Sequence, residues 1–195
     1  MYKKRAVLLG VILLGIVVFF IFVKNEEPKE NLIIQSQKTK EKDEITKEEK
    51  GVFVGDQAYD FTLLDREGNE IKLSDLKGKV VFLNFFTTWC GSCAQEMRYI
   101  QEVYEQYKEK DIVFLVVNVL AAEKKDVEGV NEFLDEKGYT FPILYDVDGN
   151  ISVKYKVNAF PATYIINQEG IVEESVTQSM EKEVMIEKIE NTLNK

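Results

Sequence analysis

The stretch KVVFLNFFTTWCGSCAQEM, from Lys79 to Met97, contains both cysteines of the chain, Cys90 and Cys93. It opens with a nearly continuous apolar run of strand length, as expected of a central β-strand that is covered on both faces. From Cys90 onward the pattern changes to that of a helix, which we expect to run to about Lys108. The two cysteines therefore lie where a buried strand gives way to a helix.

Two cysteines at this spacing can form a structural staple, half of a metal site or a redox pair. A staple works mainly by closing a long loop in the unfolded chain, and this pair encloses only Gly91 and Ser92. A structural zinc site needs four ligands, and the chain has no histidine, although carboxylates or a second subunit could complete a shell. A redox pair needs a thiol of low pKa, which a helix N-terminus provides. A strand, a CxxC motif and a helix in succession favour the redox interpretation.

The rest of the globular part alternates between strand and helix patterns. We expect hairpins at Asp60–Leu64 with Asn69–Leu73 and at Ala162–Asn167 with Ile171–Val176, strands at Lys79–Thr87, Asp111–Val119 and Phe141–Tyr145, and helices at Asp126–Lys137, Ile151–Tyr155 and Glu181–Leu193. Strands that alternate with helices of this length predict an α/β domain with crossover connections.

The N-terminal segment, residues 1–23, has the composition of a membrane anchor. Lys3, Lys4 and Arg5 precede Ala6–Val23, an uncharged run about as long as a bilayer's hydrocarbon core requires. A cleaved signal peptide is the alternative, but no small-x-small cleavage site follows the run. Because the cationic end should stay in the cytoplasm, we expect a single-pass anchor with the rest of the chain on the extracytoplasmic side.

Residues 24–50 are dominated by charged side chains and contain no aromatic residue. Such a segment cannot bury enough apolar surface to offset its ordering entropy, so we expect a flexible tether, with a charged helix at Lys38–Lys50 as the alternative. Residues 51–195 form the expected globular domain. The formal net charge of -9 argues against nucleic-acid binding, and the absence of histidine excludes Ser-His and Cys-His catalysis.

Glu96 lies near the expected buried face of the active-site helix. It follows Cys93 by three residues and precedes Ile100 by four, at the edge of an apolar stripe. Burial there would raise the pKa of its carboxyl group and would let it exchange a proton with Cys93. A solvent-exposed helix glutamate is the alternative. Glu123 and the lysines after it are expected to form a charged loop, and we assign them no role.

Several motifs together resemble the thioredoxin superfamily. These are FFTTWCGSC at Phe85–Cys93, Phe160-Pro161 about seventy residues later, and the hairpin that follows. The anchor, the leading hairpin, NVLAAEKK at residues 118–125 and Glu96 resemble the ResA and TlpA branch of anchored thiol-disulfide oxidoreductases. The resemblance spans roughly residues 52–193. It implies a thioredoxin fold, with a central mixed sheet flanked by helices and an N-terminal β-hairpin extension.

The resemblance also implies roles for individual residues. Cys90 would be the attacking thiol, Cys93 the resolving thiol and Glu96 a buried carboxylate beside them. A cis Pro161 would face the pair, and Phe160 would join it in binding substrate. Trp89, before the nucleophile, is expected to be a partly exposed substrate contact, with core packing as the alternative. The sequence departs from the branch at Arg98, where a proline is common. Gly91-Ser92 also contains no proline between the cysteines, and this dipeptide helps to set the reduction potential in the family.

We therefore expect a membrane-tethered enzyme that reduces disulfides of exported proteins, of which apocytochrome c is the best-known substrate in this branch. A CcdA-like membrane thiol reductase would supply the electrons. The only redox group implied is the Cys90–Cys93 disulfide, with no cofactor and no metal.

Three other functions remain open at this stage. A disulfide-donating oxidase would use the same motifs. A thiol peroxidase fits T-x-x-C at Thr87–Cys90, although Leu83 stands where that family has a proline. An anchored metallochaperone is the third alternative. Copper carriers of this fold need a histidine, and the chain has none.

Overall fold

The computed structural model describes residues 50–195. The expected anchor and nearly all of the expected tether lie outside the described residues. Within the described part of the chain, no helix combines the length and the apolar composition needed to cross a membrane.

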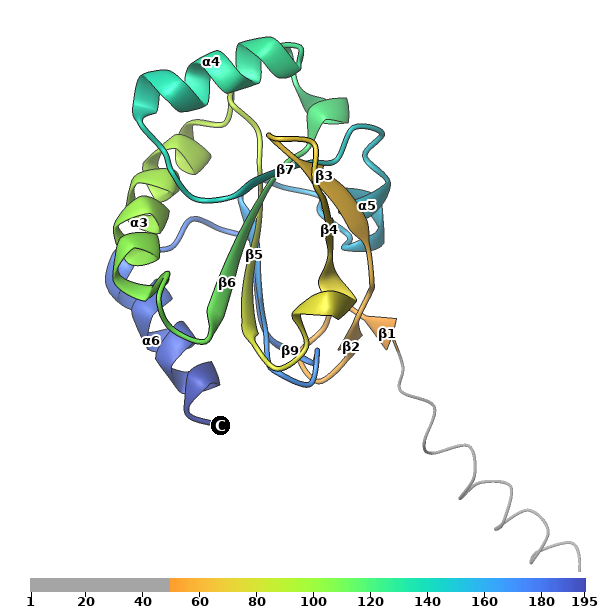
Figure 1. The fold of residues 1–195 in the computed structure, drawn as a ribbon, viewed down its shortest axis with the longest axis vertical. Coiled ribbons are helices and arrows are strands. Elements are labelled where there is room, and N and C mark those ends of the chain that lie inside the picture. The colour runs from red at the N-terminus through yellow and green to blue at the C-terminus, as the bar shows by residue number, and fades with distance from the viewer. Residues whose placement is uncertain (1–49) are drawn as a thin grey trace, which may run out of the picture. The chain divides into compact units, whose positions relative to one another are not determined.

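A seven-stranded mixed sheet carries the domain, in the order β4-β3-β7-β6-β5-β8-β9 (Figure 1). Its strands are β3 (Thr62–Asp65), β4 (Glu70–Lys72), β5 (Val80–Phe86), β6 (Ile112–Asn118), β7 (Ile143–Tyr145), β8 (Ala162–Ile166) and β9 (Val172–Val176). A separate parallel pair joins β1 (Lys50–Gly51) to β2 (Gln57–Ala58). The α-helices are α3 (Gly91–Tyr107), α4 (Val127–Lys137), α5 (Asn150–Lys154) and α6 (Lys182–Leu193), with 3-10 helices η1 (Leu73–Leu76) and η2 (Leu120–Ala122).

β5 is the central strand, and it explains the long apolar run in the sequence. It pairs in parallel with β6 along its whole length and antiparallel with β8 on its other side. Because successive side chains point to opposite faces, Phe82 and Phe86 enter one core while Leu83 and Phe85 enter the other. Both faces are covered, so an alternating polar pattern would be unfavourable here.

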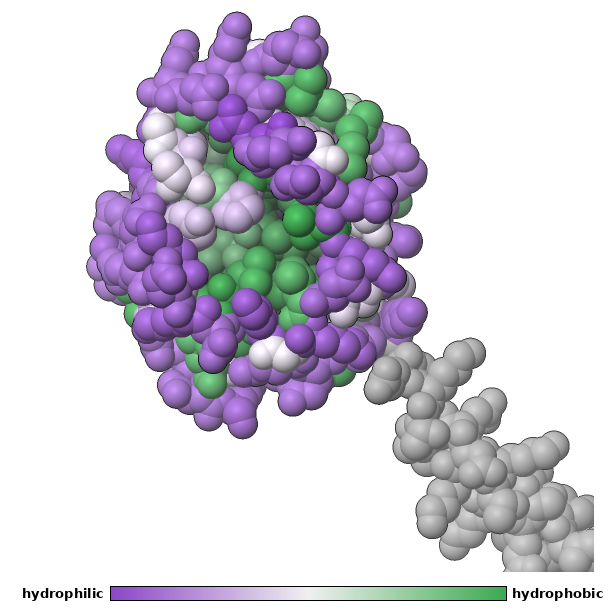
Figure 2. All heavy atoms as spheres, in the orientation of Figure 1, coloured by the Kyte–Doolittle hydropathy of each residue, from purple (hydrophilic) through white to green (hydrophobic). Residues whose placement is uncertain are grey.

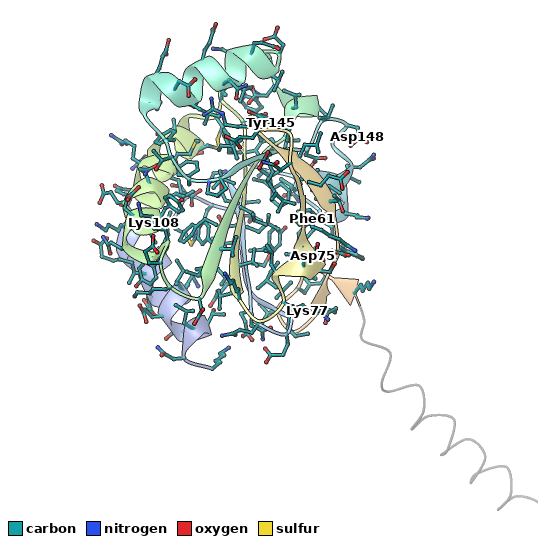
Figure 3. All side chains as sticks on the ribbon, viewed as in Figure 1. Phe61, Asp75, Lys77, Lys108, Tyr145 and Asp148 are labelled. Atoms are coloured by element: carbon teal, nitrogen blue, oxygen red, sulfur yellow. A yellow bond between two sulfur atoms is a disulfide. The ribbon has the colours of Figure 1, made fainter. Side chains whose placement is uncertain are left out.

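The two cores lie on opposite faces of the sheet. One contains apolar side chains of α3, α4 and α6, among them Ile100, Leu134 and Ile189. The other contains Tyr155, which follows α5, together with side chains from the N-terminal part of the domain such as Phe61. In Figure 3, Phe61 and Tyr145 lie among packed side chains, whereas Lys108 lies at the surface. The sheet therefore forms the middle layer of the domain.

The expected elements are present, with boundaries that differ by one to two residues. The leading hairpin is β3–β4, and it joins the edge of the main sheet through β7. β7 is shorter than the expected Phe141–Tyr145, since Pro142 has no backbone N–H to donate to a ladder. The β1–β2 pair and the 3-10 helices were not predicted from the sequence.

The shortness of β7 leaves a hollow in one face of the domain. β7 pairs with β6 only along residues 116–118, so within the described part of the chain no strand flanks the first half of β6 on that side. Figure 2 shows apolar residues gathered in a hollow with a hydrophilic rim. Its apolar lining comes from residues 71, 76, 113, 115, 139 and 141–143.

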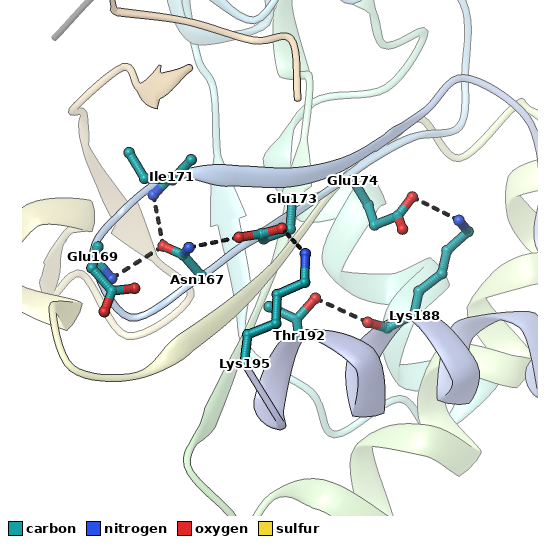
Figure 4. Close-up of polar contacts among 8 residues, drawn as sticks. All are labelled: Asn167, Glu169, Ile171, Glu173, Glu174, Lys188, Thr192 and Lys195. Carbon is teal, nitrogen blue, oxygen red and sulfur yellow. Dashed lines mark hydrogen bonds and ion pairs between the residues drawn. The ribbon is translucent and has the colours of Figure 1, made fainter. Parts of the chain in front are cut away.

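Ion pairs join the C-terminal helix to β9 (Figure 4). Lys188 of α6 lies 2.6 Å from Glu174 of β9, and Lys195 pairs with Glu173. Glu173 also accepts a hydrogen bond of 2.7 Å from the side chain of Asn167. α6 also contacts α3, whose N-terminus carries the cysteines, because Lys182 of α6 lies 2.7 Å from Glu102 of α3.

Candidate active site

Cys90 and Cys93 form a disulfide at the N-terminus of α3. Cys90 is the N-cap residue, and its sulfur accepts a hydrogen bond of 3.1 Å from the backbone N–H of Cys93. The two cysteine residues differ in exposure, because Cys90 is 7% exposed and Cys93 is fully buried. An incoming disulfide can therefore reach only Cys90, where the helix terminus favours a thiolate.

Ser92 connects the cysteines to the segment that faces them. Its hydroxyl oxygen lies 3.3 Å from the Cys90 sulfur and 3.5 Å from the backbone oxygen of Phe160. The sulfur of a disulfide carries no proton, so in this state the hydroxyl is the donor, and its single hydrogen can point to either acceptor.

The peptide bond between Phe160 and Pro161 is cis, as expected. The ring of Phe160 meets that of Trp89 edge to face, with 6.2 Å between centroids. Trp89 is 48% exposed, and its indole N–H donates a hydrogen bond of 2.8 Å to the backbone oxygen of Ala122. The expectation of a partly exposed ring is confirmed. Trp89, Phe160 and Pro161 thus lie together with the cysteine pair.

Glu96 is buried in the core beside the sheet, only 1% exposed. One carboxylate oxygen accepts a hydrogen bond of 3.0 Å from the side-chain amide of Asn84 on β5. The other oxygen accepts a hydrogen bond of 2.9 Å from the backbone N–H of Met180, in the segment between β9 and α6. The alternative of a solvent-exposed glutamate is therefore wrong, and Glu96 is enclosed from both sides.

Burial raises the pKa of Glu96 to about 7, and the hydrogen bonds from Met180 and Asn84 oppose this rise. A carboxyl group with such a pKa exists in both protonation states near neutral pH. It can accept a proton from a neighbouring group or return it, as general acid-base chemistry requires. Glu96 lies one turn beyond Cys93 on the same helix, and both side chains face the core.

Asn84 was not singled out in the sequence, although a signal for it existed. It is the only polar residue in the β5 run VVFLNFF, and it is fully buried. Its side chain donates to both Glu96 and Thr163, the latter at 2.9 Å. A polar residue inside such a strand usually has a buried partner, and here the partner is the carboxyl group at the site.

Glu123, to which the sequence analysis assigned no role, contacts the segment that leads to the cysteines. Its carboxylate accepts hydrogen bonds from the backbone N–H and the hydroxyl of Thr88, two residues before Cys90. It also accepts one from Asn118 at the end of β6. This contact could not be predicted from the sequence, because Thr88 and Glu123 are 35 positions apart and only the folded sheet brings them together.

The comparisons with known proteins agree with this geometry. A family model described as AhpC/TSA matches residues 54–175. The chain is 42% identical over 136 residues to the thiol-disulfide oxidoreductase ResA of Geobacillus kaustophilus (strain HTA426), across 70% of this chain and 76% of the relative. It is 38% identical over 145 residues to the thioredoxin-like protein YneN of Bacillus subtilis (strain 168), across 74% and 84%. The crystal structure of StoA from Bacillus subtilis aligns with a TM-score of 0.61 and 26% identity, across 67% of this chain and 96% of that one.

Proposed function

Since the chain belongs to the AhpC/TSA family and is a ResA-like thiol-disulfide oxidoreductase with a thioredoxin-like fold, we propose that it works as a reductase of protein disulfides outside the cytoplasm. The observation that carries this proposal is the asymmetry of the cysteine pair, with Cys90 partly accessible and Cys93 buried. An accessible first thiol and a protected second thiol are what a two-step exchange requires.

In the first step, the Cys90 thiolate attacks one sulfur of a substrate disulfide. The substrate S–S bond breaks, the released substrate sulfur takes up a proton, and a mixed disulfide joins Cys90 to the other substrate sulfur. The N-terminus of α3 favours the thiolate form of Cys90, because its unpaired N–H groups and dipole stabilise negative charge. The hydroxyl of Ser92 lies close enough to donate to the same sulfur.

In the second step, the Cys93 thiol gives its proton to Glu96 and attacks the Cys90 sulfur. The mixed disulfide breaks, the second substrate sulfur leaves as a thiolate that takes up a proton from solvent, and the Cys90–Cys93 disulfide forms. Two electrons have then passed from the enzyme to the substrate. A carboxyl group with a pKa of about 7 suits this task, since it accepts the proton near neutral pH and can later release it.

The substrate is an extended protein segment that docks against Trp89 and Phe160, beside Cys90. The edge-to-face contact of these two rings leaves Trp89 about half exposed next to Cys90. The bulky ring of Phe160 narrows the space before Pro161, which favours a segment with small side chains beside its disulfide. Apocytochrome c, whose cysteines lie in a CxxCH motif, is one candidate.

The proposal includes a place in the cell. Residues 1–23 would anchor the chain as a single membrane span, and residues 24–50 would tether the domain on the outer side. Thiols oxidise there, so continued reduction needs electrons carried across the membrane, and a CcdA-like membrane reductase is the class of partner that delivers them.

The two-step exchange can be tested by trapping its intermediate. We expect reduced Cys93→Ser protein to accumulate a mixed disulfide with a disulfide-bonded peptide, because nothing resolves the adduct on Cys90. Reduced Cys90→Ser protein is the matched control and should form none, since its remaining thiol is buried. Mass spectrometry under non-reducing conditions measures both. Adduct formation on Cys90→Ser instead would contradict the assignment, and faster consumption of hydrogen peroxide than of the peptide would favour a thiol peroxidase.

A further inference from the structure

Three consecutive residues after β6 contact two consecutive residues before Cys90. The backbone oxygen of Ala122 accepts the Trp89 indole N–H at 2.8 Å. The Glu123 carboxylate accepts the Thr88 backbone N–H at 2.5 Å and the Thr88 hydroxyl at 2.8 Å. The ammonium group of Lys124 lies over the Trp89 ring, 5.1 Å from its centroid. We call residues 122–124 the brace.

The brace is itself fixed to the sheet. Asn118, fully buried at the end of β6, donates a hydrogen bond of 2.7 Å to the Glu123 carboxylate. The backbone N–H of Glu123 bonds to Leu120 at 3.0 Å, which closes the turn η2. The backbone N–H of Leu120 in turn donates a hydrogen bond of 3.0 Å to the backbone oxygen of Asp146. The backbone N–H of Asp146 donates one of 2.9 Å to the backbone oxygen of Asn118. The backbone of Glu123 is therefore held in place by hydrogen bonds, and its carboxylate accepts hydrogen bonds from Thr88.

Thr88 has few other restraints on its position. It lies beyond the end of β5, in the short connection that leads to α3. The backbone N–H of Thr88 bonds to the Glu123 carboxylate, not to a neighbouring strand. A hydrogen bond from an N–H to a charged oxygen is shorter and stronger than one to a neutral acceptor. The position of Thr88, and with it the direction in which Trp89 leaves the backbone, thus depends on Glu123.

The position of Thr88 affects the substrate-binding surface through Trp89. One part of its ring is held by Ala122 and Lys124, and another meets Phe160 edge to face at 6.2 Å. The distance between the Trp89 and Phe160 rings sets the size of the surface next to Cys90 on which a substrate segment can dock. A shift of Thr88 would move the indole ring and change that width without altering the cysteine pair.

We propose that Glu123 is a positioning residue of the redox site, which fixes Thr88 and thereby sets the place of Trp89 and the docking of the substrate segment. This inference rests on the proposed function only where turnover is concerned. The position of Trp89 can be observed without turnover, because it is the only tryptophan of the chain and its fluorescence reports on this ring alone.

The test compares Glu123→Ala with Glu123→Gln in the full chain. Both variants remove the charge, but only glutamine keeps an oxygen that can accept the bonds from the Thr88 backbone N–H and from Asn118. Its amide NH2 can donate to the Thr88 hydroxyl, which then acts as acceptor. Glu132→Ala, on the exposed side of α4, is the matched control for the loss of a surface glutamate. We expect Glu123→Ala to raise the KM for a disulfide-bonded peptide about five-fold, the equivalent of one lost hydrogen bond, with kcat nearly unchanged.

Fluorescence provides the independent readout. In Glu123→Ala the Trp89 emission should move to longer wavelength and become easier to quench with iodide, in both the oxidised and the reduced protein. Glu123→Gln should recover most of the wild-type emission and KM. Thr88→Val removes only the hydroxyl donor, so it should shift both readouts in the same direction by less. It also keeps the test available if Glu123→Ala does not fold.

Several results would overturn the inference. One is wild-type emission and KM in Glu123→Ala, with or without a lower melting temperature, since a purely structural role would leave both readouts unchanged. Another is a Glu123→Gln variant as defective as Glu123→Ala, because the charge and not the hydrogen-bond geometry would then matter. If the wild-type protein reduces no peptide, the proposed function fails, while the fluorescence still decides the role of Glu123.

Discussion

The carboxyl group of Glu96 is enclosed by Asn84 of β5 and by the backbone of Met180. Burial keeps its proton attached up to a pH of about 7, whereas an ordinary glutamate loses its proton near pH 4.5. In the oxidised protein the cysteines do not titrate, and the chain has no histidine. Among the described side chains, Glu96 therefore dominates the proton balance between pH 5 and 8.

This predicts how the stability of the oxidised protein depends on pH. Between pH 5 and 7 the unfolded chain has already lost the Glu96 proton while the folded protein still holds it, so the folded state binds more protons. The free energy of unfolding should then fall as pH rises, by about 2 kcal/mol from pH 5 to 8, and level off above the folded pKa. Urea denaturation of the oxidised protein at each pH measures it.

Glu96→Gln is the control, since glutamine has the same shape and does not titrate. Its stability should stay flat over this range, and its resolution step after mixed-disulfide formation should be slower than in the wild type above pH 7. If both proteins show the same pH profile and the same exchange rates, Glu96 neither has the raised pKa nor carries the proton.

At the scale of single elements, the short helix α5 depends on a buried carboxylate. A helix of five residues is too short to be stable by itself. Asp146, fully buried after β7, accepts hydrogen bonds from the backbone N–H groups of Ile151 at 3.1 Å and Ser152 at 2.7 Å. These are among the N–H groups that have no partner inside a helix. Asp146 thus holds the start of α5 against the end of the sheet.

Asp146→Ala should lower the free energy of unfolding by about 2–3 kcal/mol, because one buried and one partly buried N–H group lose their acceptor. Asp148→Ala is the matched control. Asp148 is exposed and accepts only from Asn150 in the same turn, so its removal should cost less than about 1 kcal/mol. Urea denaturation gives both values. Equal losses of unfolding free energy in the two variants would show that the burial of Asp146 adds nothing to stability.

Most elements could be predicted because their signals are local. β5 and β6 are apolar runs, and α4 starts at the capping residue Asp126 and ends at Gly138, whose φ of 70° favours glycine. The cysteine pair and Glu96 follow from the same local patterns. The contacts of Glu123 and the β1–β2 pair could not be predicted, since both depend on side chains and backbone brought together by the folded sheet.

At the scale of the whole domain, the redox site and the first described residues lie at opposite ends of the sheet. The cysteines follow the end of β5, whereas Val81 at its start pairs with Ile166 of β8, which pairs with Val172 of β9. The backbone N–H of Gly55 bonds to that same Val172 at 2.8 Å. A tether that joins the domain at Lys50 would therefore leave the face with Cys90 directed away from the point of attachment.

If the protein donates electrons to substrate disulfides, the Cys90–Cys93 couple must be reducing, and its reduction potential decides this. The full chain in detergent is equilibrated against defined thiol buffers, and the reduced fraction is measured by the mass shift after alkylation. We expect a value near that of thioredoxin, about -270 mV, at which the dithiol reduces substrate disulfides. A value near that of the oxidant DsbA, about -120 mV, would contradict it and make the protein a disulfide donor.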